Sequence, residues 1–297
     1  MPSDSKEEQK GILILGLAAF SFSLFSVFAK AVSPEISTSQ LVLIRSAIIV
    51  PVLALWAFQR RQPLFGKKRF LLLLRGGLGS LGLFTFFYAL RRLPLADTVL
   101  IFQAHPLLVA LLAPWLLKER NRPVHWILLL ISFAGVALIV GPTGAGDWEG
   151  RLSALICCVL AGFVYILVRF LRRSEPTLTV AFSFPAITLL LFGPPFLLHI
   201  PGFTWMPPSL QDWCYLFAMA LFAAGGQVLM TLGLGKVPAA RGTALSNLQV
   251  AFALIYGMVF FDEIPALYTL AGAAIIVCAQ ILLAATRVEK FDRCPTS

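Results

Sequence analysis

Hydrophobic residues in this chain form long runs that short polar segments separate. Each run has about 20 residues, which is the length that an α-helix needs to cross the hydrocarbon core of a bilayer. Ten such runs can be drawn, at residues 11–30, 39–58, 70–90, 95–117, 124–141, 150–171, 178–198, 212–234, 239–261 and 265–286. Because unpaired sheet edges cannot face lipid, the pattern predicts an all-α membrane protein with ten transmembrane helices.

The segments between the runs leave no room for a soluble domain. They are mostly 3 to 13 residues long, and the Pro-rich segment 199–211 is expected to be the longest ordered loop. The first run is too long for the apolar part of a signal peptide, and nine more runs follow it. We therefore expect this run to remain as an uncleaved helix.

The composition narrows the class of protein further. Hydrophobic residues make up 59% of the chain and charged residues 13%, against roughly 25% charged residues in a typical soluble domain. This excludes a soluble enzyme, a disordered chain and a disulfide-stabilised secreted module. The five cysteines are odd in number and have no C-x-x-C spacing, so we interpret them as packing residues. No metal site and no cofactor is expected.

The positive charges predict the orientation in the membrane. The net charge is +10, but the Lys and Arg residues stand in short clusters between apolar runs, so we expect no nucleic-acid partner. With the N-terminus in the cytoplasm, 18 of the 24 Lys and Arg residues fall on the cytoplasmic side and 4 on the outer side. The remaining two, Arg45 and Arg75, lie within runs. Because cytoplasmic loops are enriched in Lys and Arg, this division predicts that both termini are cytoplasmic.

The two halves of the chain align with each other. Residues 88–96 lie over residues 232–240 at an offset of 144 without a gap. Further aligned positions share a glycine or a charge. At an offset of 144, Gly82 aligns with Gly226 and Glu119 with Glu263. At an offset of 139, Gly11 aligns with Gly150 and Lys30 with Arg169. We therefore expect a cytoplasmic tail at residues 1–10, five-helix repeats at 11–141 and 150–286, and a second tail at 287–297.

An odd number of helices in each repeat has a consequence for transport. The second repeat must enter the membrane from the opposite side, so the repeats are expected to be inverted. Inverted repeats of this kind are typical of transporters that alternate access around a central site. A duplication retained only for packing is the other interpretation of the same pattern.

Several sequence segments resemble the drug/metabolite transporter superfamily, EamA type. They are Tyr88–Asp97 (YALRRLPLAD), the LKER segment 117–120 with the later AGVALIV segment 134–140, and in the second copy FDE at 261–263 and LAGAA at 270–274. The resemblance covers residues 11–286. It implies a ten-helix carrier whose cavity is lined by the first, third, fourth, sixth, eighth and ninth helices, with the fifth and tenth at the periphery. It also implies a substrate among amino acids, drugs, nucleotide sugars, phosphorylated sugars or carboxylates. The second copy has Ala279 where the first has Gly135, which is a packing difference.

Polar residues inside the runs are the candidates for substrate binding, because burying them in hydrocarbon is costly. Gln103 and His105 lie in the middle of the fourth run, and Asn247 and Gln249 lie at the corresponding positions of the ninth. Residues two apart point to opposite sides of a helix, so we favour His105 and Asn247 as the pair that faces the cavity. Pro106 leaves the carbonyl of Phe102 without its helical donor. His105 could bind substrate or hold two helices together.

Arg45 is the charged residue that lies deepest within a run. Arginine suits carboxylate or phosphate groups, so Arg45 could bind an anionic substrate, although it could instead bond a carbonyl or extend to the interface. Arg75 is expected to extend to the interface. We find no carboxylate in the middle of a run, which argues against strong ion coupling and leaves His105 as the central proton-carrying candidate. Facilitated diffusion or exchange is the expected energetics.

Other candidates rest on weaker patterns. Tyr165 and Tyr256 carry hydroxyl groups that need partners when buried, and Phe20, Ser21 and Gln227 complete the set of expected substrate-binding residues. The segment Gly77–Gly82 fits G-x-G-x-x-G, but it lies inside an apolar run rather than between a strand and a helix, so we interpret it as a helix-packing surface.

These patterns together predict a secondary transporter and not an enzyme. The expected substrate is a small polar organic metabolite, an amino acid or a related compound, moved by efflux or exchange. A carboxylate or other organic-anion carrier is the alternative within transport. A membrane-embedded enzyme or a non-transporting scaffold is the alternative of another class. The expected location is a bacterial inner membrane, the expected partners are the substrate and the lipid bilayer, and the sequence leaves a homodimer open.

Overall fold

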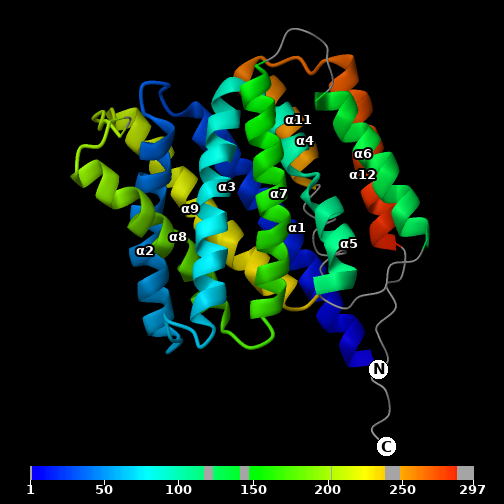
Figure 1. Cartoon of the computed structure of the whole chain (residues 1–297), viewed down its shortest axis with the longest axis horizontal. Helices are drawn as coiled ribbons and strands as arrows, with labels where there is room; N and C mark the ends of the chain where they lie inside the picture. The colour runs from blue at the N-terminus through cyan, green and yellow to red at the C-terminus, as the bar shows by residue number, and fades with distance from the viewer. Residues whose placement is uncertain (1, 117–122, 141–146, 202, 238–247, 286–297) are drawn as a thin grey trace, which may run out of the picture.

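Apolar runs become helices throughout the part of the chain that the structure describes. The computed structural model describes residues 2–116, 123–140, 147–201, 203–237 and 248–285, and no strand occurs in these ranges. The helices pack side by side into one bundle (Figure 1). They are α1 (Pro2–Ala31), α2 (Thr38–Gln59), α3 (Arg69–Arg92), α4 (Leu95–Phe102), α5 (His105–Leu116), α6 (Pro123–Val140), α7 (Trp148–Leu171), α8 (Thr177–Leu197), α9 (Leu210–Leu234), α11 (Leu248–Phe261) and α12 (Leu267–Ala285).

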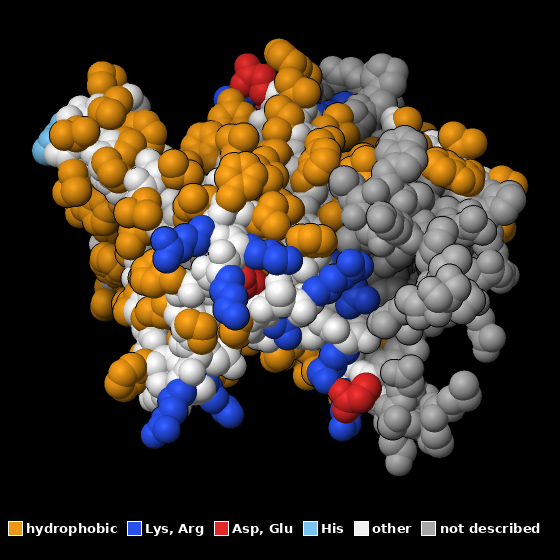
Figure 2. Space-filling view, turned by 60° about the horizontal axis from the view of Figure 1, so that its bottom comes forward, with side chains coloured by type: hydrophobic (Ala, Val, Ile, Leu, Met, Phe, Trp, Pro, Cys, Tyr) orange, Lys and Arg blue, Asp and Glu red, His pale blue; other side chains and the backbone are white. Residues whose placement is uncertain are grey.

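Six of these helices are long and apolar enough to cross a membrane: α1, α2, α3, α7, α8 and α9. Between 33% and 61% of the residues in their most apolar windows are buried inside the bundle. Much of the remaining apolar surface therefore faces outward, where water would make it very costly. Figure 2 shows hydrophobic side chains gathered over the upper and left parts of the visible face. The protein is an integral membrane protein, and its predicted all-α class is confirmed.

Two helix pairs form the centre of the bundle, and two further pairs flank it. Helix α1 packs along α9, and α3 packs along α7. On one side α2 packs against α8, and on the other α6 packs against α12 (Figure 1). The position of α6 and α12 agrees with the expectation that the fifth and tenth runs lie at the periphery.

A glycine-rich face of α3 lets two neighbouring helices approach closely. A Cβ atom added to Gly79 would lie 2.9 Å from the Phe184 ring of α8, and one added to Gly82 would lie 3.5 Å from Leu160 of α7. The same applies to Gly76, where an added Cβ would lie 2.2 Å from Ile187 of α8. The interpretation of Gly77–Gly82 as a packing surface is confirmed, although Gly77 itself has open space around it.

The two ends of the bundle differ in charge. The end where α1 begins and α2 is joined to α3 carries clustered basic residues, which face the viewer in Figure 2. They include Lys67, Lys68 and Arg69 beside Phe170. At this end Lys68 donates its backbone N–H to Glu175 at 2.8 Å, and Lys236 pairs with Glu7.

At the opposite end, an ion pair joins three segments that are far apart in sequence. Lys30, in the last turn of α1, pairs with Glu263 and donates to the carbonyl of Leu93 at 2.9 Å. The other Glu263 oxygen accepts the backbone N–H of Leu95 at 2.7 Å, which caps the first turn of α4. We call this set of contacts the Lys30–Glu263 latch.

The end of α11 explains why Glu263 points toward α4. The helix ends at Phe261, and Asp262 has a φ of 51°, a left-handed conformation that aspartate tolerates better than most residues. The N–H of Glu263 then donates to the carbonyl of Gly257 at 3.0 Å, six residues earlier. This bond and the left-handed Asp262 end α11 and turn the chain away from the helix axis.

Candidate functional site

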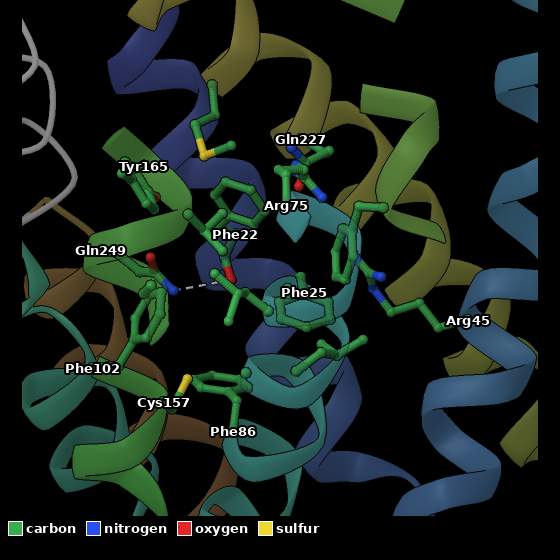
Figure 3. Close-up of a pocket in the computed structure, with 18 residues that line it drawn as sticks. Phe22, Phe25, Arg45, Arg75, Phe86, Phe102, Cys157, Tyr165, Gln227 and Gln249 are labelled. Carbon is green, nitrogen blue, oxygen red and sulfur yellow. Dashed lines mark hydrogen bonds between the residues drawn. The ribbon is translucent and has the colours of Figure 1, made fainter. Parts of the chain in front are cut away.

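A cavity lies in the middle of the bundle, between the helices of the two halves (Figure 3). Its volume is about 120 Å³, several times the roughly 10–15 Å³ that one buried water needs. Aromatic rings make up much of its wall, and five larger polar side chains reach it: Arg45, Arg75, Tyr165, Gln227 and Gln249. In the part of the chain that the structure describes, no Asp or Glu lines this cavity.

The two arginines reach the cavity from adjacent helices, Arg45 from α2 and Arg75 from α3 (Figure 3). Their side chains are buried, with exposed fractions of 3% and 1%. The Nε and Nη1 atoms of both have no hydrogen-bond partner among the described residues. Arg75 therefore does not extend to the interface, and that prediction was wrong. Its side chain bends inward because the small glycines of α3 leave room beside Phe184.

Aromatic rings hold the two guanidinium groups in place. The Cζ atom of Arg45 lies 5.0 Å from the centre of the Phe184 ring, and that of Arg75 lies 4.7 Å from the same ring. Arg45 is also 5.5 Å from the Phe25 ring. Cation–π contacts of this kind stabilise a desolvated guanidinium but leave its N–H groups without acceptors. The arrangement can therefore bind an acceptor-rich anionic group.

Two amides supply neutral polar groups to the same cavity. Gln249 of α11 donates from Nε2 to the Phe22 carbonyl at 3.3 Å (Figure 3). Gln227 of α9 reaches the same cavity, and its Nε2 donates to Thr231 at 3.4 Å. Both contacts are long for hydrogen bonds, so each amide can exchange its partner for a ligand at low cost.

His105 lies behind the cavity wall rather than in it. The fourth run is divided at Gln103 and Ala104, between α4 and α5, as the proline at 106 predicts. Nδ1 of His105 donates to the freed Phe102 carbonyl at 3.0 Å. The imidazole ring packs 4.3 Å from the Tyr165 ring, measured between centroids, and is fully buried. These contacts are those of a residue that stabilises the helix break, and its Nε2 has no partner among the described residues.

The other predicted residues divide into two groups. Arg45, Tyr165, Gln227 and Gln249 line the cavity, whereas Gln103, His105, Phe20, Ser21 and Tyr256 do not. Phe20 and Tyr256 both pack on Phe252, at ring-centroid distances of 5.5 and 6.0 Å. Ser21 lies beside Gly225 of α9. Asn247 falls outside the described residues, and Gln249, its less favoured neighbour, is the one found at the cavity.

Several wall residues were not predicted. Phe22, Phe25 and Phe184 are three of the 25 phenylalanines, and nothing in the sequence distinguishes them from the others that fill the bundle. Arg45 of α2 and Phe184 of α8 also show that the second and seventh runs contribute to the wall, which the resemblance did not imply. Within the described ranges, no group of His, Cys, Asp and Glu side chains could hold a metal ion.

Comparisons with known proteins identify the class to which this fold and cavity belong. The chain matches the EamA-like transporter family twice, over residues 9–141 and 148–285. It therefore belongs to this family and is a membrane transporter of the drug/metabolite transporter kind.

Individual relatives carry names that point to transport rather than catalysis. A pseudopaline exporter of Pseudomonas aeruginosa, CntI, is 30% identical over 281 residues, which cover 94% of this chain and 97% of the exporter. The human solute carrier family 35 member G1 is 27% identical, covering 91% of this chain and 78% of the human protein. A solved crystal structure, 21% identical, has the same fold with a TM-score of 0.67 and covers 96% of this chain and 97% of its own.

Proposed function

We propose that this protein is a secondary transporter that moves a small organic metabolite bearing a carboxylate or similar anionic group. The observation that carries the proposal is the pair of buried arginines in a central cavity, whose Nε and Nη1 atoms lack acceptors. An anionic group would supply those acceptors and neutralise charge that is costly to bury. This favours the organic-anion carrier over a carrier for neutral polar compounds, and amino-acid derivatives remain substrates as far as they carry the anionic group.

Alternating access between two inverted five-helix repeats is the proposed mechanism. The double family match supports a duplication. The helix packing supports its symmetry: α1 packs along α9, whereas α7 and α3, their counterparts in the other half, pack along each other. Likewise α4 contacts α7, and α11 contacts α1. On this proposal all ten runs cross the membrane, both termini are cytoplasmic, and the cavity opens to each side in turn.

Export or exchange across a bacterial inner membrane is the proposed direction and location. The exporter named among the relatives supports export, and its bacterial source supports the membrane. A membrane-embedded enzyme or a scaffold would not require a central cavity shared by both halves. A transporter can be distinguished from these two alternatives by measurement, because sealed vesicles that contain an enzyme or a scaffold would show no substrate flux.

The test is uptake of labelled compounds into proteoliposomes that contain the purified protein. Amino acids, carboxylates, nucleosides and phosphorylated sugars form the panel, and we expect flux only for compounds with an anionic group. Arg45→Gln should abolish that flux while the protein remains folded, as judged by its melting temperature. Arg92→Gln is the matched control, because Arg92 is partly exposed and pairs with Asp147 at the end of the bundle. Flux that survives Arg45→Gln unchanged would overturn the anion assignment.

A further inference from the structure

The two arginines of the cavity form one cluster rather than two independent sites. Both guanidinium groups lie over the same ring, Phe184, at 5.0 and 4.7 Å from Cζ to its centre. Arg45 comes from α2 and Arg75 from α3, and Gly76 and Gly79 let α3 pack closely against α8, which carries the Phe184 ring. Like charges repel strongly in a medium of low dielectric constant. The fold therefore holds two positive charges together at a cost in free energy.

Two other partly buried cations in the described part of the chain, Lys30 and Arg169, each donate to at least one oxygen acceptor, which the arginines of this cluster do not. Lys30 pairs with Glu263 and bonds the Leu93 carbonyl, and Arg169 bonds the Leu234 carbonyl. In contrast, neither Arg45 nor Arg75 pairs with a carboxylate among the described residues, although both are more deeply buried. Within the described ranges, the two guanidinium groups therefore leave two positive charges without a carboxylate partner.

The number of charges discriminates between classes of anion. A zwitterionic amino acid brings no net charge and adds an ammonium group, for which the described wall offers no carboxylate. A monoanion neutralises one guanidinium and leaves the other buried and uncompensated, which is costly. A dianion neutralises both and can offer each planar guanidinium its own pair of oxygens.

We propose that the cavity binds a small organic dianion, with one negative charge facing Arg45 and the other facing Arg75. The proposal rests on the proposed function and specifies its substrate class. The rings of Phe22 and Phe25 would pack on the carbon skeleton of the ligand. The amides of Gln227 and Gln249, whose present hydrogen bonds are 3.3 Å or longer, would bond its remaining polar groups.

The experiment compares pairs of closely similar ligands that differ by one negative charge, with the full chain in lipid nanodiscs at pH 7.5. Succinate is measured against its monoamide succinamate, glutarate against its monoamide, and glycerol 3-phosphate against its methyl ester. Both carboxylates of the diacids are ionised at this pH. Calorimetric titration should show that at least one dianion binds about 30-fold or more tightly than its monoanionic partner, as expected when one of two buried charges loses its counter-charge. The carboxylate and phosphate pairs show which source of the dianion the cavity accepts.

Two variants locate the charges. Arg45→Gln and Arg75→Gln should each reduce the preference for the dianion over its monoanionic partner to less than about 5-fold. Each variant removes one charge of the cluster, so the main effect should be weaker binding of the dianion. Arg92→Gln, outside the cavity, should leave the preference unchanged. If either cavity variant fails to fold, the comparison of ligand pairs on the unmodified protein still decides the question.

The outcomes separate this proposal from the proposed function. The dianion proposal would be overturned if the dianions and their monoanionic partners bound equally well, or if a zwitterionic amino acid such as alanine bound more tightly. Either result would still be compatible with an anion carrier. A failure of every dianion to bind would also overturn the dianion proposal. Absence of both binding and flux for all anionic compounds would overturn the proposed function itself.

Discussion

Three neighbouring residues of α3 face very different surroundings. Gly76 is pressed against α8, where an added Cβ would lie 2.2 Å from Cδ1 and 2.8 Å from Cβ of Ile187. The Cβ atom of Ile187 cannot move away by side-chain rotation, so any larger residue at 76 must push α3 and α8 apart. Gly77, the next residue, has no atom within 4 Å of an added Cβ. Arg75 precedes both and lines the cavity, so the contact at Gly76 also fixes the position of a charged group.

This contrast provides a matched pair of variants. Gly76→Ala should destabilise the protein by about 1–3 kcal/mol, the usual cost of overpacking a filled core. Gly77→Ala should be neutral or stabilising by up to ~1 kcal/mol, because alanine favours helices over glycine. Thermal unfolding of both in the same detergent measures the difference. Equal melting temperatures for the two variants would show that α3 and α8 do not approach as closely as described.

Individual residues also mark the limit of sequence interpretation. Gln249 and Asn247 are both polar and lie two positions apart, so periodicity alone cannot decide which faces inward when the helix orientation is unknown. Arg75 was misread because its position near one end of a run suggested an exposed charge. Its burial depends on space left by glycines that pack against α8, and that contact joins residues more than 100 positions apart.

Among the elements, the Lys30–Glu263 latch joins the end of α1, the start of α4 and the turn after α11. Lys30 and Glu263 are only partly exposed, at 17% and 21% of their side chains, so their attraction is less screened than that of a surface pair. In an alternating-access cycle, this end of the bundle must open for the cavity to reach that side of the membrane. Separating α1 from α11 would break the latch, so the latch should favour the state in which this end is closed.

Weakening the latch should therefore increase access to the cavity from that side. Glu263→Gln removes the charge but keeps an oxygen that can accept from Leu95. Cys157, which lines the cavity, is a natural reporter once the other four cysteines are replaced. A membrane-impermeant maleimide added from the side of the Lys30 end should label Cys157 about 5-fold faster in the variant, a change equivalent to ~1 kcal/mol.

Glu149→Gln is the control for this measurement. Glu149 lies at the same end and pairs with Arg92 at 3.2 Å, but its side chain is 47% exposed and it does not bond α4. We expect its labelling rate to match that of the parent protein. A rate in Glu263→Gln no higher than in Glu149→Gln would mean that the latch does not control access.

At the scale of elements, the sequence predicted more than at the scale of residues. Long apolar runs specify helices because burial in lipid leaves the backbone few alternatives. The helix break beside Pro106 was also predictable, since proline removes a hydrogen bond whatever the tertiary context. The latch was not, although Lys30 and Glu263 both appeared in the internal alignment. Alignment relates corresponding positions in the two repeats, whereas the latch joins positions that do not correspond.

For the whole molecule, the distribution of Lys and Arg residues and the internal repeat predict the same membrane topology. Five crossings per repeat reverse the direction of the second, and ten crossings return the chain to its starting side. Of the 24 Lys and Arg residues, 18 then lie on the cytoplasmic side. In the bundle, Lys67 and Lys68 lie at one end and the Lys30–Glu263 latch lies at the other. A parallel arrangement would place half of the basic clusters outside, against the positive-inside rule.

Single cysteines in a cysteine-free background test this topology in intact cells. We expect an impermeant thiol reagent to label Trp205→Cys, in the exposed loop before α9, and to leave Lys68→Cys and Ser297→Cys unlabelled until the membrane is permeabilised. Labelling of Lys68→Cys in intact cells would mean that the whole molecule has the opposite orientation in the membrane. The two repeats would still be inverted relative to each other. Labelling of Ser297→Cys in intact cells, with Lys68→Cys still unlabelled, would place the two termini on opposite sides of the membrane. That outcome requires an odd number of crossings, so the two five-helix units could not both span the membrane, and alternation between inverted halves would be excluded.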